Sequence, residues 1–165
     1  MSITLELEPS FVLAERIPLT AEDLRYGLEH FFLKKRAVID LAVDQVRRGT
    51  SDPVLHELAA LLGDEVERVP EVLDALDDPE RTHDPRETVR KWLYLQLKAA
   101  YSQRGQLRDP LGVVEQIYAD FDYPPSVSPL VRNMPVRPGD EPGKAALIQS
   151  WARFLEDEHR SLTSP

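Results

Sequence analysis

Two aspartates separated by a single residue, Asp120 and Asp122, are the first candidates for chemistry in this chain. A D-x-D pair offers carboxylate oxygens to Mg²⁺, although such sites need further supporting groups and often a substrate phosphate. One hypothesis is therefore a metal-dependent enzyme or metal-binding protein centred on this pair, with Arg132 nearby. The competing interpretation is a helix end, because Tyr123 precedes Pro124 and is biased out of α conformation. We favour the helix end and predict neither a metal nor a cofactor.

Two Glu-x-x-His pairs, Glu80–His83 and Glu156–His159, offer a second route to metal chemistry. Di-iron carboxylate proteins place two such pairs on the helices of a bundle. The first pair lies between Pro79 and Pro85, where a regular helix is unfavourable. The chain also has no cysteine, no G-x-S-x-G, no phosphate-binding glycine loop and no H-E-x-x-H. We therefore predict that the protein is not an enzyme and has no catalytic residue.

The formal net charge of −9 is concentrated in one window, Asp52–Glu87, which holds twelve acids and three bases. The remainder of the 165-residue chain balances 17 acids with 17 bases. Such a run is often a solvated helix face, but the contrast with the rest of the chain also suits a surface for a basic partner. The candidate protein-binding residues are Asp64, Glu65, Glu67, Glu71, Asp74, Asp77 and Asp78.

Helix signals dominate the elements that would position these groups. Thr20–Asp23 resembles a capping box with aspartate in the place of glutamate. Asp-Pro occurs four times, and three copies precede helical patterns, as expected for an aspartate N-cap followed by proline at the first helical position. In the acidic window, the apolar residues fall at helical spacing and should face inward; they are Val54, Leu55, Leu58, Leu61, Leu62, Val69, Val72, Leu73 and Leu76.

The resulting expectation is an all-α protein, a single compact domain of about six or seven helices over residues 1–165. Residues 1–17 are expected to form an N-terminal arm, because their only pattern is a short alternation that resembles an edge strand. Residues 123–142 contain six prolines and predict an extended arm before the C-terminal helix, with one turn near Val127–Val131. Residues 160–165 are expected to fray. We further expect Tyr118, Phe121 and Tyr123 to be largely buried.

The segment DPLGVVEQIYADFDYPPSVSPLVRNMP, from Asp109 to Pro135, resembles the hallmark of an uncharacterised bacterial family. Members of that family carry a Y-A-D-F-D-Y-P signature followed by R-x-M-P, and PLTAEDLRYGLEH near the N-terminus is also similar. Asn133 departs from the aromatic residue expected there. The matching signature residues are Tyr118, Asp120, Phe121, Asp122, Tyr123, Pro124 and Arg132. The resemblance brings no catalytic residues; some small acidic bacterial families of this kind are immunity proteins in toxin–antitoxin systems.

These observations favour a non-enzymatic, cytoplasmic protein-binding protein, of which an immunity-type inhibitor of a basic toxin domain is the leading form. A scaffold subunit of another bacterial complex is a further alternative to the metal-dependent hypothesis. The net charge argues against a nucleic-acid partner. No apolar run approaches the roughly 20 residues that span a bilayer, and the N-terminus lacks the pattern of a secretory signal. The oligomeric state is not encoded in any of these patterns.

Overall fold

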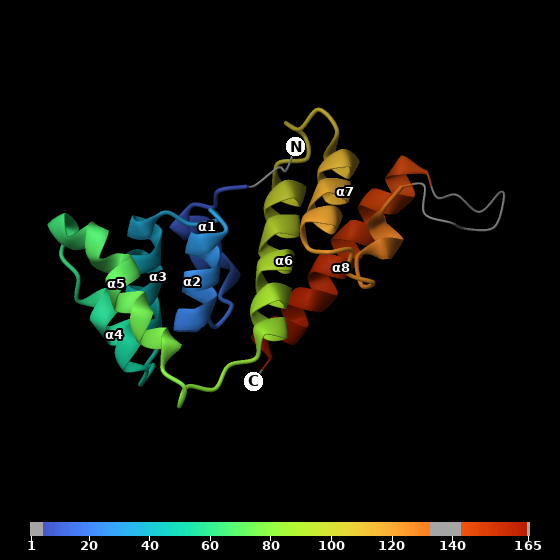
Figure 1. The fold of residues 1–165 in the computed structure, drawn as a ribbon. Coiled ribbons are helices and arrows are strands. Elements are labelled where there is room, and N and C mark those ends of the chain that lie inside the picture. The colour runs from blue at the N-terminus through green and yellow to red at the C-terminus, as the bar shows by residue number, and fades with distance from the viewer. Residues whose placement is uncertain (1–4, 133–142, 165) are drawn as a thin grey trace. The chain divides into compact units, whose positions relative to one another are not determined.

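The computed structural model describes residues 5–132 and 143–164, and these residues form an all-α structure (Figure 1). The α-helices are α1 (Pro9–Glu15), α2 (Ala21–Glu29), α3 (Lys35–Arg47), α4 (Pro53–Ala59), α5 (Val69–Leu73), α6 (Pro85–Ser102), α7 (Pro110–Asp120) and α8 (Lys144–Thr163). The 3₁₀-helices are η1 (Gly63–Arg68), η2 (Asp74–Asp77) and η3 (Ser128–Leu130). No β-strand occurs within the described residues, so the predicted fold class is confirmed.

The chain divides into two compact units, and the boundary falls inside α6, between Trp92 and Leu93. The N-terminal unit is residues 6–92. The C-terminal unit contains the described residues from Leu93 onward together with Leu5. The expectation that the whole chain forms a single domain stays a prediction.

Helix caps and close packing define the N-terminal unit. Thr20 and Asp23 form the predicted capping box, with the Asp23 amide donating to Thr20 Oγ1 over 3.1 Å and the Thr20 amide donating to Asp23 Oδ2 over 2.8 Å. Asp52 caps α4 by accepting from the Val54 amide over 3.0 Å. Gly27 lets α2 approach Trp92, because a Cβ at this position would lie 2.5 Å from the indole ring. In the same unit, α3 packs against α4.

In the C-terminal unit, α7, α8 and the second half of α6 pack around large apolar side chains. Trp151 on α8 is fully buried, and its ring meets Tyr101 on α6 edge to face, with centroids 5.2 Å apart. Gln96, also buried, donates from Nε2 to the backbone carbonyl of Leu5 over 2.8 Å. This bond gives the amide the partner that a buried polar group requires.

Two of the predicted irregular segments are wrong in part. Within residues 1–17, residues 9–15 form α1, because Pro9 supplies a helix start and Val12 is buried. Helix α8 continues through most of the predicted frayed tail as far as Thr163, because Leu162 is buried. The prediction of fraying over residues 160–163 therefore fails.

The predicted proline-rich arm, residues 123–142, is described only as far as Arg132. That part contains a turn and η3, whose Leu130 is buried together with Val127. The turn predicted near Val127–Val131 is therefore present as η3, and the remainder of the predicted arm, 133–142, lies outside the described residues. In the acidic window, α5 is followed directly by η2.

Candidate functional site

The signature segment is the C-terminal cap of α7. The Asp122 amide donates to the Ala119 carbonyl over 3.1 Å, and the Tyr123 amide donates to the Tyr118 carbonyl over 2.8 Å. These two bonds define a Schellman motif, which places a left-handed residue just after the helix. Asp122 occupies that place with φ of 62°, and Tyr123 follows with φ of 57°. The Y-A-D-F-D-Y-P sequence therefore encodes a helix stop.

The aromatic residues of the signature are less buried than the sequence predicts. Tyr118 and Phe121 are half-buried, and Tyr123 is 60% exposed. The rings of Tyr118 and Tyr123 meet edge to face with centroids 5.3 Å apart. A contact between these two positions commonly accompanies a Schellman motif. The prediction of burial is wrong for Tyr123, because its ring covers Tyr118 from the solvent side of the cap.

The side chain of Arg132 bonds to carboxylates at α7 other than those of the D-x-D pair. Its Nε donates to Glu115 Oε1 over 2.7 Å, and its two terminal nitrogens donate to Asp109 over 3.2 and 3.0 Å. These bonds hold the pKa of Asp109 below its ordinary value, and the Gly112 amide bonded to the same carboxylate lowers it further. The pair of carboxylates raises the pKa of Arg132. Arg132 therefore ties the chain after the signature back to the N-cap of α7.

The D-x-D pair has no cluster of metal ligands around it. Asp120 is exposed and accepts from Gln116 Nε2 over 3.0 Å, and Asp122 is exposed in the cap. Across residues 5–132 and 143–164, no three or more His, Asp or Glu side chains are arranged to hold a metal ion. The predicted role of the aspartates as part of a helix end agrees with the backbone bonds of the cap.

The acidic window runs from the N-cap of α4 to the first turn of α6, and most of its carboxylates lie on η1, α5, η2 and the loop before α6. Ten of its twelve acids are exposed, and only Asp52 and Glu65 are half-buried. The apolar positions face inward as predicted at Val69, Val72, Leu73 and Leu76, all of which are buried. Leu61 is only half-buried, and the prediction fails at Leu62, which lies just before η1 and is 67% exposed. We call the exposed face from Asp64 to Asp78 the acidic surface.

The seven candidate protein-binding residues differ in how firmly the fold already holds them. Glu65 accepts from the Leu62 amide over 3.0 Å, a bond that lowers the pKa of this carboxyl together with the ion pair to Arg68. Other fixed members are Glu67 with Lys35 at 2.5 Å, Asp77 with Arg25 at 2.8 Å, Asp78 with the Glu80 amide at 2.9 Å, and Glu71 with Arg68 at 3.8 Å. Within the described chain, Asp64 and Asp74 have no such bond. The assignment of all seven residues to partner binding stays a prediction.

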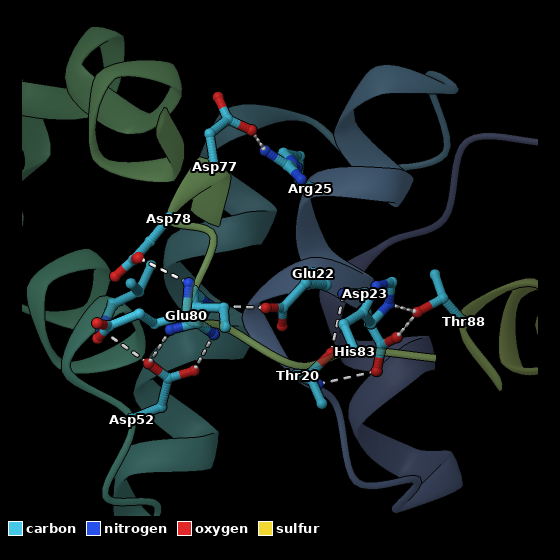
Figure 2. Close-up of polar contacts among 12 residues, drawn as sticks. Thr20, Glu22, Asp23, Arg25, Asp52, Asp77, Asp78, Glu80, His83 and Thr88 are labelled. Atoms are coloured by element: carbon cyan, nitrogen blue, oxygen red, sulfur yellow. Dashed lines mark hydrogen bonds and ion pairs between the residues drawn. The ribbon is translucent and has the colours of Figure 1, made fainter. Parts of the chain in front are cut away.

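A polar network behind the acidic surface is the feature that sequence reasoning missed (Figure 2). Arg81, in the loop before α6, donates from Nε to Glu22 Oε1 over 2.8 Å and from Nη2 to Asp52 Oδ2 over 2.8 Å. It therefore joins the loop to both α2 and the N-cap of α4. The hydrogen bond from Arg81 is the main cause of the lowered pKa of Asp52, and both carboxylates raise the pKa of Arg81.

Asp23 is the buried centre of a second set of bonds. Besides the capping box, its carboxylate accepts from Thr88 Oγ1 over 2.6 Å and from Lys91 Nζ over 2.8 Å. Because the Thr88 proton goes to Asp23, the imidazole of His83 must donate its Nε2 proton to Thr88, over 2.7 Å. The Trp92 indole also donates to the Asp23 carbonyl. Asp23 is thus fully bonded and joins α2 to the start of α6.

A shallow pocket of about 130 Å³ opens beside this network in the N-terminal unit. Its lining includes Glu22, Tyr26, Glu29, His83, Thr88 and Val89. Burial raises the pKa of the Tyr26 hydroxyl. Sequence spacing gave no sign of this pocket, because its residues come from α2, from the loop before α6 and from α6 itself, more than fifty positions later.

The fold and these surfaces define a small all-α protein with an acidic face. Its residues 10–159 match the family DUF2247, described as an uncharacterised protein conserved in bacteria, and the chain belongs to that family. The match confirms the resemblance to an uncharacterised bacterial family seen in the sequence. No curated protein and no solved structure matches the chain. None of the helices in the described parts of the chain is both long and apolar enough to cross a membrane.

Proposed function

We propose that the protein is a non-enzymatic, cytoplasmic binding protein, an immunity-type inhibitor that neutralises a basic toxin domain. The observation that carries this proposal is the acidic surface, where carboxylates face solvent on η1, α5 and η2, while Val69, Val72, Leu73 and Leu76 on α5 and η2 are buried. Exposed ion pairs contribute little to folding, with a median of about 0–1 kcal/mol each. A partner accounts for such a density of carboxylates better than folding does.

Leu62 gives the acidic surface the composition of a protein-binding patch. Interfaces generally combine an apolar centre with a polar rim. Leu62 is 67% exposed immediately before η1, and Asp64 and Glu67 follow it with exposed carboxylates. An apolar anchor with neighbouring carboxylates suits a partner surface in which basic residues surround a small apolar area.

The acidic surface would act in two ways. It would speed the encounter with the basic partner, and it would then cover the substrate-binding surface of that partner. Complementary charge steers diffusing partners together and raises association rates at low ionic strength. If the toxin domain acts on nucleic acid, its substrate surface is basic because it must contact phosphates. Carboxylates bound over that surface would exclude the substrate without any chemistry by the inhibitor.

The direct test is complex formation with the basic domain of a toxin-like protein encoded beside this one. The purified domain and the full chain should form a stable complex in gel filtration, and the activity of the domain should fall as the complex forms. A variant with Leu62→Ser and Asp74→Lys should bind more weakly, while a control variant with Glu8→Lys and Phe31→Ser, two exposed positions outside the acidic surface, should not. Absence of a complex, or a complex in which the toxin domain stays fully active, would contradict the proposal.

A further inference from the structure

We infer that the pocket beside Glu22 receives one long basic side chain, lysine or arginine, from the protein partner. This inference deepens the proposed function, since it names the group on the partner that enters this site. The pocket, of about 130 Å³, is well below the roughly 300 Å³ at which pockets for drug-sized ligands begin. Its size therefore suits a single side chain or a very small molecule.

The carboxylate of Glu22 is the group that would recognise the charge. Glu22 is only 7% exposed, and Arg81 bonds one of its oxygens, Oε1, over 2.8 Å. Within the described chain, the second oxygen, Oε2, accepts no hydrogen bond, and Figure 2 shows it without a bond. A carboxylate oxygen with unused capacity, on a side chain that is otherwise largely buried, is a strong acceptor for an ammonium or guanidinium donor.

The charges around the pocket favour a cation despite the two arginines nearby. Arg25 lies on the pocket wall, but Asp77 at 2.8 Å and Glu29 at 3.9 Å pair with it. Arg81 is shared between Glu22 and Asp52.

Those six side chains form one group of connected charges with the buried pair Asp23 and Lys91. It holds five carboxylates and three cations, which gives a formal charge of −2 with histidine neutral. A cation therefore enters a field of the opposite sign.

The walls of the pocket suit the stem of a basic side chain. Tyr26, Pro85 and Val89 contribute apolar surface. Lysine and arginine bury their methylene stems along apolar surface while the charged head seeks polar partners. An aromatic ring such as Tyr26 also attracts a cation placed over its face. The methylene stem of the basic side chain therefore meets apolar surface, and its charged head meets polar and aromatic partners.

A larger pocket in the same unit lacks these features. It measures about 250 Å³ and lies beside α1, between Glu6 and Asp40. Four of its charged side chains form two ion pairs, Lys34 with Glu6 at 3.3 Å and Arg36 with Asp40 at 3.7 Å, and a fifth, Glu8, is exposed. No buried carboxylate faces it, so it offers no comparable recognition of charge.

The test uses amino-acid amides, which need no toxin domain, so its failure and the failure of the proposed function are distinguishable. The ¹⁵N-labelled full chain is titrated with N-acetyl-lysine methylamide, N-acetyl-arginine methylamide and, as the uncharged control, N-acetyl-norleucine methylamide. At least one basic probe should give saturable amide shifts confined to residues around Tyr26, Glu29, His83 and Val89. The norleucine probe should give none.

Two variants separate recognition from folding. Glu29→Gln changes an exposed carboxylate and should weaken binding about two- to fivefold, the range for an exposed ion pair. Glu22→Gln should weaken it about tenfold or more, as for a lost bond to a charged group. Glu57→Gln, an exposed change outside the pocket, should have no effect, and circular dichroism verifies that each variant is folded. Shifts that are absent, unsaturable, equal for norleucine or unchanged in Glu29→Gln would overturn the inference.

Discussion

Tyr118 and Tyr123 meet edge to face across the end of α7, with ring centroids 5.3 Å apart. The backbone bond between the same two residues closes the Schellman motif, so ring contact and main-chain contact support one cap. Replacing Tyr123 with Ala should lower the free energy of unfolding by about 0.5–1.5 kcal/mol, the value of an aromatic pair. Urea denaturation measures the change, and a double-mutant cycle with Tyr118→Ala should recover a coupling of similar size. Additive effects would show that the ring contact has no energetic role.

Asp122 adopts a left-handed conformation that glycine accepts at no steric cost. Asp122→Gly should therefore raise the free energy of unfolding, by about 0.5–1 kcal/mol after the greater chain entropy of glycine is included. Asp122→Ala removes the same carboxylate but keeps the steric conflict, so it should not stabilise. If both variants were equally destabilised, the carboxylate itself would be important, and the metal-site hypothesis for this pair would regain weight.

Arg81 connects the loop before α6 to α2 and to α4, and its removal leaves the buried Glu22 without its partner. Arg81→Met should lower the free energy of unfolding by about 1.5–3 kcal/mol, the usual contribution of hydrogen bonds to charged groups. Arg86→Met is a matched control, because Arg86 lies five residues away and is almost fully exposed. That control should change stability by no more than about 0.5 kcal/mol. Equal effects would contradict the structural role of Arg81.

The same network predicts a pH dependence. Arg81 lowers the pKa of Asp52 in the folded protein below the ordinary 3.8, so the unfolded chain takes up a proton at higher pH than the folded chain does. The contribution of Asp52 to the free energy of unfolding is therefore complete above pH 3.8. It is lost as the pH falls through the lowered pKa of Asp52 in the folded protein. Asp52→Asn keeps the capping ability. The stability gap between wild type and this variant should be large at neutral pH and shrink below 3.8; a constant gap would contradict the pairing.

Gly27 faces the indole of Trp92 so closely that an added methyl group would overlap it. Gly27→Ala should lower the free energy of unfolding by about 1–3 kcal/mol, as overpacked positions do. Gly105→Ala is the control, because a Cβ there meets nothing within 4 Å. Thermal unfolding of the two variants checks the difference. A neutral result at Gly27 would mean that Trp92 moves aside freely.

The sequence predicted the all-α class and most helix starts because those signals are local. Asp-Pro pairs and the Thr20 capping box satisfy backbone amides within three residues, so no tertiary information is needed. Schellman caps end α2, α3 and α7. Gly49 supplies the usual glycine signal after α3, but Phe31 and Asp122 occupy the left-handed positions after α2 and α7, where that signal is missing. Helix α1 was missed because only one of its residues is buried and the pattern is too short to detect.

The candidate site likewise combines features that local sequence predicts with features that depend on tertiary contacts. The acidic surface follows from composition and helical spacing, which is why most of its carboxylates were expected to face solvent. The network of Glu22, Asp52 and Arg81 joins positions separated by 29 and 59 residues, and no local pattern links them. The burial of Glu22 was likewise invisible, because a glutamate in the first turn of a helix is ordinarily a solvated group.

The central claim is that the acidic surface drives encounter with a basic partner. The most direct measurement is the association rate between the full chain and the basic toxin-like domain encoded beside it, at low and at moderate salt. The variant Asp64→Lys, Glu71→Lys and Asp74→Lys avoids the carboxylates of Glu65 and Glu67, which the fold already uses. The control Glu8→Lys, Asp120→Lys and Glu156→Lys makes the same total charge change at exposed acids elsewhere. We predict that the first variant associates about tenfold or more slowly at low salt and loses most of its salt dependence, while the control changes much less. Equal rates for the two variants would contradict the claim.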